Sequence, residues 1–348
     1  MTSVWSSFCE SSGSVVNSGT AGPAQTGTFI MRIHDDDTDF IPTLSFPKSR
    51  GAGYPDGPVT VQTTLGKPVR FSGRGLFHGV NAGVRLLPAD DDTGIIFRRV
   101  DLAGKPEIPA RVEYVRSAAR RTVLGARGAT VETVEHLMAA LAGLQIDNCI
   151  VEIDAPEVPA GDGSCSIFCD AITNAGTTTL IAPRKYLRIP EAHAAAGTDG
   201  ERIEITPLHG DTASICYQVD YGTESPVPKC SLAVDFTPEV FLREIAMART
   251  FVLEDEIESL RNMGFGKHLT GRDLVVFCND GTISDNSLRW DDEPVRHKIL
   301  DCLGDLSLCG ISFIGQVIAF RSGHRLNHVM ASTMSMIAGR SLAVRRAA

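Results

Sequence analysis

From residue 59 onward, apolar and polar residues alternate in short segments that predict β-strands. Gly, Pro and Asp turns separate these segments, and β-branched residues are frequent within them. The strands predicted for this first block lie at 59–64, 69–72, 81–87, 94–99 and 146–153. Two stretches with apolar residues at helical spacing, 133–143 and 166–174, predict helices in the same block.

A second block with the same alternation follows a proline-bounded connection near Ala182 and Pro183. Its predicted strands lie at 185–189, 202–207, 213–219, 231–236, 249–252, 274–278, 282–284 and 316–321. Its predicted helices lie at 238–248, 255–263, 291–306 and 325–338. Asn279-Asp280-Gly281 is a hairpin signal. The two blocks predict an α+β protein of two similar sandwich domains, 58–184 and 185–348, although no sequence repeat relates them.

Residues 1–57 have a different composition from either block. Ser, Gly, Thr, Asp and Pro dominate, and apolar residues occur singly or in pairs. Such a segment cannot bury enough apolar surface to offset the entropy lost on ordering. It also lacks the basic stretch followed by an apolar stretch of a secretory signal. We therefore predict a disordered N-terminal tail.

The predicted helix 133–143 carries the first candidate catalytic pair. Thr133 is its predicted N-cap and Gly143 its predicted stop. Glu135 and His136 do not fit a plain core helix, because a general base beside a metal-binding imidazole is what a hydrolytic metal site needs. A capping carboxylate followed by a surface histidine is the commoner explanation for such a pair.

The predicted helix 291–306 carries a second candidate group. Lys298, Asp301 and Asp305 fall within about 100° of His297 around the helix axis, and apolar residues occupy the opposite side. His297 and Asp301 have the i, i+4 spacing at which two side chains can bind one ion. A solvated polar face with a routine His–Asp contact is the alternative explanation.

A third candidate, His324, follows the predicted strand 316–321 in the sequence Ser322-Gly-His324. A strand-to-helix turn is a usual place for catalytic side chains. Judged by itself, an ordinary loop histidine is the commoner explanation for this position.

The composition restricts the partners that such a site could have. A 348-residue chain with 43% hydrophobic and 22% charged residues is typical of a soluble globular protein, and no apolar run is long enough for a transmembrane segment. The net charge of -9 argues against nucleic acid as a partner. The nine cysteines are scattered without a Cys-x-x-Cys pair, which argues against disulfides or a cysteine zinc site and predicts a reducing cytoplasm.

Together these segments resemble the zinc-dependent UDP-3-O-acyl-N-acetylglucosamine deacetylases, which carry out the committed step of lipid A biosynthesis. The resemblance runs from residue 59 to the end of the chain, in the family's order and spacing. It implies two domains, each a mostly antiparallel sheet with two helices, and helices packed between the two sheets. The matching segments are Thr133-Val-Glu-His-Leu137, Ala139-Ala-Leu-Ala-Gly143, Ile146-Asp-Asn148, Asp162-Gly-Ser164, Ala248-Arg-Thr-Phe251, Val295-Arg-His-Lys298, Leu300-Asp301, Gly304-Asp305 and Ser322-Gly-His324.

The resemblance implies one Zn²⁺ per chain, bound by His136, His297 and Asp301 with water in the fourth position. Three N/O ligands with an open position are typical of catalytic zinc, although Fe²⁺ also suits such a site. The resemblance assigns Glu135 as the general base that takes the proton of the attacking water. One carboxylate ligand leaves the ion positive, which lowers the pKa of the bound water.

The resemblance also implies groups that stabilise the tetrahedral intermediate and its leaving amine. It assigns Thr250 and Lys298 to the developing oxyanion. It assigns His324 as the cationic residue that protonates the amine, and Asp305 as the carboxylate that orients this imidazole. A general base together with a general acid predicts a bell-shaped dependence of the rate on pH.

The implied substrate is a UDP-linked acylated glucosamine, and the enzyme is expected to act on it as a monomer. Lys298 and Arg321 are expected at the nucleotide end, with Arg321 in place of the lysine usual in the family, and Phe251 is expected to contact the sugar or chain. The sequence does not identify the walls of the implied acyl passage. Phe77, followed by His78, stands where the family commonly has a histidine, and segment 264–271 also departs from the usual pattern.

Two other functions remain open at this point. One is a zinc amidase acting on a different nucleotide sugar or amino sugar. The other is a binding protein that has kept the fold without the chemistry, against which the presence of every implied metal ligand, the base and the acid argues. A zinc peptidase is disfavoured, because the chain has no His-Glu-x-x-His stretch.

Overall fold

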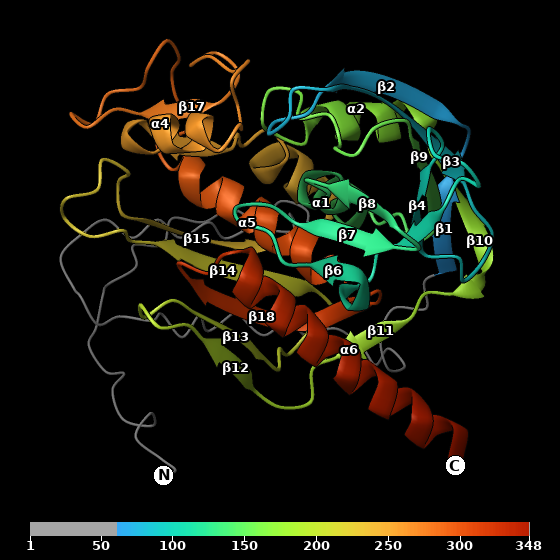
Figure 1. Ribbon diagram of the computed structural model, residues 1–348. Coiled ribbons are helices and arrows are strands. Elements are labelled where there is room, and N and C mark those ends of the chain that lie inside the picture. The colour runs from blue at the N-terminus through green and yellow to red at the C-terminus, as the bar shows by residue number, and fades with distance from the viewer. Residues whose placement is uncertain (1–60, 348) are drawn as a thin grey trace, which may run out of the picture.

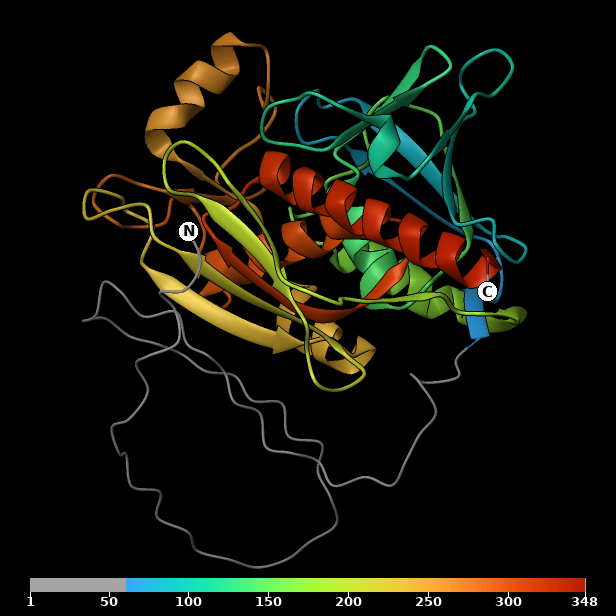
Figure 2. The same ribbon diagram turned by 90° about the horizontal axis from the view of Figure 1, so that it is seen from below.

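The computed structural model describes residues 61–347, and the predicted tail 1–57 lies outside the described residues. Two mixed β-sheets form the outer layers of the described chain, and helices lie between them (Figure 1; Figure 2). The prediction of an α+β fold made of two similar sandwiches is confirmed. The domain limits 58–184 and 185–348 stay predictions.

The first sheet has the strand order β2-β3-β9-β4-β5. These strands are β2 (Val69–Arg74), β3 (Asn81–Pro88), β9 (Cys149–Ile153), β4 (Ile95–Arg99) and β5 (Glu107–Pro109). β4 and β9 are parallel, and the other neighbours are antiparallel. Ala82, Val84 and Leu86 of β3 are buried and alternate with more exposed residues, so one face of the sheet is directed into the core.

Two helices and two smaller sheets complete the first half. The helices α1 (Glu135–Gly143) and α2 (Ser166–Ala175) contact each other, and α2 packs on β2. An antiparallel sheet precedes α1 and consists of β6 (Val115–Arg116), β7 (Val123–Ala126) and β8 (Ala129–Glu132), after the 3-10 turn η1 (Val112–Tyr114). The second small sheet is the antiparallel pair β1 (Val61–Leu65) and β10 (Thr177–Pro183).

The second sheet repeats the topology of the first, with the order β12-β13-β18-β14-β15. Its strands are β12 (His193–Ala196), β13 (Arg202–Thr206), β18 (Ser312–Phe320), β14 (Ala213–Val219) and β15 (Cys230–Asp235). β14 and β18 are its parallel pair, in the place that β4 and β9 have in the first sheet. The short strand β11 (Tyr186–Arg188) also pairs with the beginning of β18. The two halves are therefore a structural repeat that the sequence does not reveal.

The helices α5 (Glu293–Ser307) and α6 (His324–Ala347) correspond in order to α1 and α2. Between β15 and α5 the chain forms a separate unit, in which β16 and β17 pair in parallel. This unit consists of α3 (Pro238–Val240), the π-helical turn η2 (Phe241–Ile245), β16 (Phe251–Leu253), α4 (Glu254–Asn262) and β17 (Val275–Phe277). The helix predicted at 238–248 is present but ends at residue 245, and it widens from one α-turn at 238–240 into a π-turn at 241–245.

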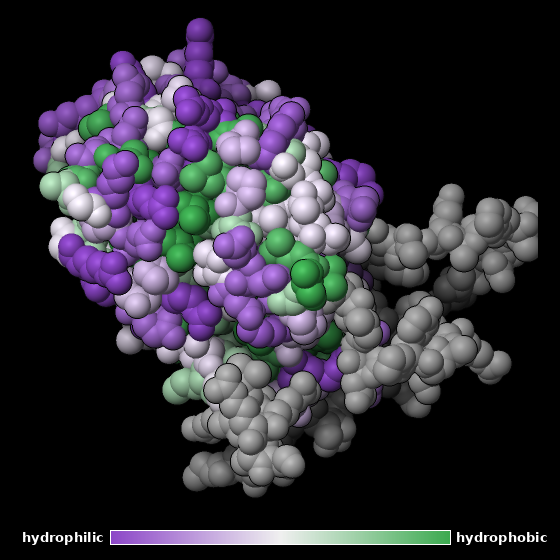
Figure 3. All heavy atoms as spheres, turned by 90° about the vertical axis from the view of Figure 1, so that its right-hand side faces the viewer, coloured by the Kyte–Doolittle hydropathy of each residue, from purple (hydrophilic) through white to green (hydrophobic). Residues whose placement is uncertain are grey.

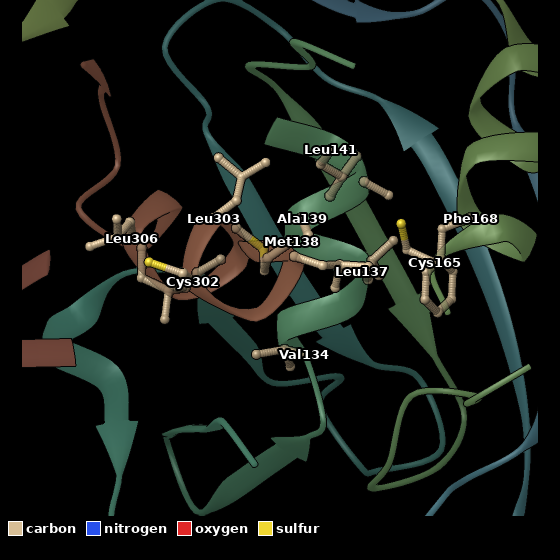
Figure 4. Packing of buried hydrophobic residues seen from close by; sticks show 14 of the residues in the cluster. Val134, Leu137, Met138, Ala139, Leu141, Cys165, Phe168, Cys302, Leu303 and Leu306 are labelled. Carbon is tan, nitrogen blue, oxygen red and sulfur yellow. The ribbon is translucent and has the colours of Figure 1, made fainter. Parts of the chain in front are cut away.

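The core lies where α1 and α5 cross between the sheets. Figure 4 shows Met138 and Ala139 of α1 beside Cys302 and Leu303 of α5, with Phe168 of α2 on the far side of α1. All of these side chains are buried. Removing them from water is the main contribution that holds the two halves together.

The outer surface is mixed in character. On the face shown in Figure 3, hydrophobic side chains are interspersed with polar ones wherever described residues are visible. Among the described helices, none combines the length and the apolar character that a membrane span requires.

The ends of α1 differ from the sequence prediction, for two physical reasons. Thr133 is not the N-cap: its φ is 56°, and its hydroxyl donates to Glu157 Oε1 at 3.2 Å. Gly143 is the last helical residue, and a Cβ built there would lie 2.4 Å from the ring of Phe241. Close packing, rather than a left-handed stop, therefore requires this glycine.

Candidate active site

The candidate site lies where α1 and α5 pack side by side (Figure 1). A Cβ built on Gly304 of α5 would lie 2.1 Å from the carbonyl oxygen of Glu135 and 3.2 Å from the amide nitrogen of Ala139. Only glycine permits this approach of one helix backbone to another. The contact brings the first turn of α1 next to the polar face of α5.

His136, His297 and Asp301 converge at this crossing. Asp301 Oδ1 lies 3.5 Å from His136 Nε2 and 3.3 Å from His297 Nε2. The two imidazole rings are nearly perpendicular, with centroids 5.0 Å apart. One donor atom from each of the three buried residues lies within 4.8 Å of the others, so together they could bind a metal ion.

Two of the three residues, His297 and Asp301, also have the protonation states that a divalent metal requires. His297 Nδ1 lies 3.1 Å from the carbonyl oxygen of Ala248, which leaves Nε2 as the free lone pair. Burial lowers the pKa of His297 to about 4, so this imidazole is neutral. Burial opposes ionisation of Asp301, but His297 and Lys298 outweigh it and hold the pKa of Asp301 well below its usual value. A neutral imidazole at His297 and an ionised carboxylate at Asp301, with the imidazole of His136 beside them, fit Zn²⁺.

Glu135 lies beside these residues and is almost completely buried, with 3% of its surface exposed. The backbone N–H of Thr122, which precedes β7, donates to Glu135 Oε2 at 3.0 Å. Burial raises the pKa of this carboxyl, which moves it toward the range of a general base that works near neutral pH. Glu135 Oε1 lies 3.9 Å from His324 Nε2, so the base and the acid predicted from the sequence are close to each other.

His324 is the first residue of α6 and contacts Asp305 of α5. His324 Nδ1 lies 2.8 Å from Asp305 Oδ2. Burial disfavours the charged imidazole, but the Asp305 carboxylate outweighs burial and raises the pKa of His324 to about 9. The imidazole therefore carries a proton at neutral pH, and its Nε2 faces Glu135.

Lys298, Thr250 and Phe251 line the same cavity as the metal-binding group. Lys298 Nζ donates to Asp301 Oδ2 at 3.0 Å and lies 5.8 Å from the centre of the Phe251 ring. Burial opposes the charge on Lys298, but Asp301 outweighs it and raises the pKa of the lysine. The backbone N–H of Thr250 donates to the carbonyl oxygen of Gly163 at 2.8 Å, which fixes the beginning of β16.

A buried ion pair explains the arginine between Ala248 and Thr250. Arg249 Nε and Nη2 donate to the two carboxylate oxygens of Glu293, at 2.8 Å and 2.9 Å. Glu293 is the first residue of α5, so this bidentate pair fixes β16 to the helix that carries His297 and Asp301.

A cavity of about 980 Å³ opens beside the metal-binding group. Its polar end includes Glu135, His136, His297, Lys298 and Asp301, together with Thr250, Phe251 and His324. Its apolar lining comes from α4, from the segment after it, from β16 and β17 and from the first half: Leu76, Phe77, Val252, Ile257, Leu260, Phe265, Leu269, Leu274 and Val276. Four charged residues of α4 also line the cavity: Glu254, Asp255, Glu256 and Arg261. The structure thus contains a cavity with apolar walls beside the metal-binding group, and the sequence did not identify these wall residues.

Two of the departures from the family pattern, Phe77 and segment 264–271, contact each other at this cavity. Phe77 and Phe265 stack edge to face with centroids 5.4 Å apart, and the backbone N–H of Gly266 donates to the carbonyl oxygen of Phe77 at 2.8 Å. The guanidinium of Arg121 lies 4.4 Å and 5.0 Å from the two ring centres. The unusual segment 264–271 is therefore packed against the unusual Phe77.

Two of the predicted site residues do not line the cavity. Asp305 lies behind His324, as expected for an orienting carboxylate. Arg321 is directed elsewhere: its guanidinium donates to the carbonyl oxygen of Asp199 and lies 5.0 Å from the Phe320 ring centre. The structure thus brings together every predicted site residue except Arg321.

Sequence reasoning missed three residues that contact the site from behind. The Thr122 hydroxyl donates to Asp305 Oδ1 at 2.6 Å, and Asn327 Nδ2 donates to Asp305 Oδ2 at 2.9 Å. His328 Nε2 lies 2.9 Å from the Thr122 hydroxyl oxygen. His328 could have been noticed from its i, i+4 spacing to His324, whereas a single threonine between strands gives no such signal.

Comparison with known proteins agrees with this geometry. Residues 62–336 match the model of the UDP-3-O-acyl N-acetylglycosamine deacetylase family. A UDP-3-O-acyl-N-acetylglucosamine deacetylase of Teredinibacter turnerae is 41% identical over 273 residues, which are 77% of this chain and 88% of the relative. A protein of the same name from Brucella melitensis biotype 2 is 39% identical over 270 residues, which are 76% of this chain and 92% of the relative. The chain therefore belongs to the UDP-3-O-acyl N-acetylglycosamine deacetylase family.

Proposed function

We propose that this chain is a zinc-dependent amide hydrolase that removes the N-acetyl group of UDP-3-O-(3-hydroxyacyl)-N-acetylglucosamine and releases acetate, as a step of lipid A biosynthesis. The observation that carries the proposal is the convergence of His136, His297 and Asp301 between a buried carboxylate, Glu135, and a protonated imidazole, His324. This arrangement contains a metal-binding group, a base and an acid that line one cavity.

His136, His297 and Asp301 would hold the metal, through both Nε2 atoms and a carboxylate oxygen of Asp301. Zn²⁺ bound there would polarise the amide carbonyl and lower the pKa of water near it. Lys298 would keep the second oxygen of Asp301 occupied, so that one oxygen is presented to the ion. Fe²⁺ would suit the same donors.

Glu135 would remove the proton of the water that attacks the acetamide carbonyl carbon. Its Oε2 is fixed by the N–H of Thr122, and its Oε1 is directed toward His324, so the side chain is held in one orientation before the substrate arrives. A buried carboxyl with a raised pKa accepts a proton more readily than an exposed one.

Thr250 and Lys298 would stabilise the oxyanion that develops on the carbonyl oxygen. Both line the cavity next to the metal-binding group, and the threonine hydroxyl and the ammonium can each donate a hydrogen bond. The backbone N–H of Thr250 is already bonded to Gly163, which holds this residue at the beginning of β16.

His324 would donate its proton to the departing nitrogen as the C–N bond breaks. An amine leaves poorly as an anion, so a charged acid is needed at this step. Asp305 holds the imidazole by its Nδ1, which leaves the Nε2–H free to act. The amine then leaves with this proton, and the acetate keeps the oxygen of the attacking water.

The apolar portion of the cavity would hold the 3-hydroxyacyl chain, with the walls provided mainly by α4, β16 and β17. Phe251 would contact the sugar or the beginning of the chain, and Lys298 is the cation placed to meet the nucleotide end. Arg321 is retained as a candidate for the diphosphate only through movement of its side chain away from Asp199. We further propose a monomer in the cytoplasm, where the free thiols of the described cysteines are stable.

The alternative of an amidase for simple N-acetyl sugars is disfavoured by the apolar cavity walls, which a small polar sugar would leave exposed to water.

The test is an acetate-release assay on the UDP-linked acylated substrate and, in parallel, on N-acetylglucosamine. We expect release from the acylated substrate only, its loss with a chelator, and its recovery when Zn²⁺ is added back. The variant His297→Ala should be inactive and should lack zinc by elemental analysis. Release that persists in a metal-free sample would overturn the proposal.

A further inference from the structure

His328 extends the hydrogen-bonded group behind the catalytic acid. It lies one helical turn after His324 on α6, and the two imidazoles are stacked with an angle of 28° and centroids 6.3 Å apart. Its Nε2 lies 2.9 Å from the hydroxyl oxygen of Thr122 and 3.3 Å from Asp305 Oδ1. Its side chain is 16% exposed, so it is more accessible to water than Asp305, which is completely buried.

The hydrogen bonds have only one consistent direction. The Thr122 hydroxyl has one proton, and the 2.6 Å contact with Asp305 Oδ1 takes it. Thr122 must therefore accept from His328, whose Nε2 carries a proton. The result is a chain of donors from His328 through Thr122 to Asp305 Oδ1, while His324 donates to the other oxygen, Oδ2.

We propose that His328 is a positioning residue of the active site. It acts through Thr122 and Asp305 and holds His324 in place. It also makes Asp305 retain the proton of His324 less firmly. This inference rests on the proposed function. The Asp305 carboxylate is shared: Thr122, which accepts from His328, donates to Oδ1, and His324 and Asn327 donate to Oδ2. A carboxylate that accepts hydrogen bonds at both oxygens has less negative charge to share with either donor, so it retains the proton of each one less firmly.

Other charged groups near His328 do not remove this effect. Within the described chain, α5 presents Asp305 and, further away, Asp301, and α1 presents Glu135. Arg325 on α6 is paired with Glu201 at 3.2 Å and lines the cavity, and Glu113 of η1 lies 3.5 Å from Ser335, further along α6. Of these groups, only Asp305 contacts His328 directly. Burial opposes ionisation of Asp305, but His324 and His328 together outweigh it and hold the pKa of Asp305 well below its usual value.

The role of this hydrogen-bonded group follows from the proton transfer that His324 must perform. A general acid transfers a proton best when its pKa lies near the working pH. A histidine held by a buried aspartate alone becomes a weak acid, since the carboxylate stabilises the imidazolium. A second donor on the same carboxylate lets His324 stay charged and still release its proton to the amine.

The test compares two variants, His328→Ala and His328→Gln, in the zinc-loaded full-length chain. Alanine removes the donor, whereas glutamine can place an amide N–H near the position of Nε2 without being able to carry a charge. For His328→Ala we expect kcat to fall by about tenfold, which corresponds to one misplaced hydrogen bond, with KM nearly unchanged. The alkaline limb of the pH–rate profile should move upward by about half a pH unit. His328→Gln should restore most of kcat, and Val329→Ala, an exposed neighbour on the same helix, should match the unchanged protein.

A second measurement does not depend on catalysis. The titration of the His324 imidazole, followed by NMR with labelled histidine, should move upward in His328→Ala and return toward the original value in His328→Gln. If both the titration and the pH–rate profile of His328→Ala equal those of the unchanged protein, the inference is wrong. It is also wrong if alanine and glutamine behave alike. If the unchanged protein releases no acetate while the titration shifts as expected, the proposed function fails and the inference about His328 stands.

Discussion

Helices α1 and α5 occupy equivalent places in the two halves of the molecule, yet they serve the site in different ways. α1 contributes Glu135 and His136 from its first turn only, and the rest of it is apolar and buried. α5 contributes His297, Asp301 and Asp305 along one face over more than two turns. The site thus lies at the contact between the two repeated halves of the chain, and each half contributes different residues to it.

The segments that precede the two helices differ even more. In the first half, the small sheet β6-β7-β8 leads into α1, and Thr122 beside β7 binds both Glu135 and Asp305. In the second half, β16, α4 and β17 lead into α5 and line much of the cavity. The comparison suggests a different role for each of these two insertions. The sheet β6-β7-β8 orders the catalytic groups, and the unit β16-α4-β17 selects the substrate. The predictions below test this division.

The largest effect is expected from Glu135→Gln, which removes the base that α1 contributes. The rate of acetate release should fall by about a thousandfold, within the range typical of general bases. Zinc content by elemental analysis should be unchanged, because glutamine leaves His136 and the two ligands on α5 in place. The exposed Glu258→Gln on α4 is the control. Turnover equal to that of the unchanged protein would show that α1 contributes only a ligand.

Asp305→Asn tests the contribution of α5 behind the acid, and the direction of its effect on pH can be derived. Asp305 raises the pKa of His324 to about 9, so the proton needed by the leaving amine is present below that pH and is lost as the pH rises through it. Without the negative charge, the pKa of His324 falls and the alkaline limb moves to lower pH. We expect kcat at neutral pH to fall by about a hundredfold.

The pH–rate profiles of Asp305→Asn and of Asp291→Asn, an exposed position just before α5, provide the comparison. If the alkaline limb of the Asp305→Asn profile moves to higher pH, or does not move, Asp305 does not control the proton of His324. The shift is opposite to the one expected for His328→Ala, so the two residues are distinguished by sign.

The sequence identified most residues of this site but not the contacts that join them. The residues that the two helices contribute lie in short motifs with a definite spacing, and the polar face of α5 follows from helical geometry. Thr122 carries no such pattern, because its role depends on Asp305, which is far away in the chain. The motif Gly304-Asp305 includes the glycine but does not show that Gly304 packs against the backbone of Glu135. The arginine at 321 shows the opposite case, where a motif places a residue near the site but its side chain is directed to Asp199.

Gly304→Ala tests the contact between the helices themselves. The added methyl would meet the carbonyl oxygen of Glu135, which belongs to the backbone and cannot rotate away, so α1 and α5 must move apart. We expect the free energy of unfolding to fall by about 2 kcal/mol and kcat to fall by about tenfold. Gly339→Ala on α6, where no atom lies within 4 Å of an added Cβ, is the matched control in a denaturant titration. Equal stability of the two variants would contradict the role assigned to this contact.

The smallest effect is expected from Leu260→Ala, which tests whether the unit β16-α4-β17 selects the substrate. Leu260 on α4 lines the cavity, so its truncation removes apolar contact from a bound chain and leaves the catalytic groups untouched. KM for a long-chain substrate should rise by about fivefold, as the loss of roughly 1 kcal/mol of apolar burial predicts. For an analogue with a short acyl group, KM should stay unchanged, and kcat should be the same for both substrates. Met263→Ala, at a position near the end of the same helix that is 59% exposed and does not line the cavity, controls for a general effect on α4. A rise in KM that is independent of chain length would mean that α4 affects binding of the nucleotide or the sugar instead. The separate roles assigned to the sheet β6-β7-β8 and to the unit β16-α4-β17 would then be wrong.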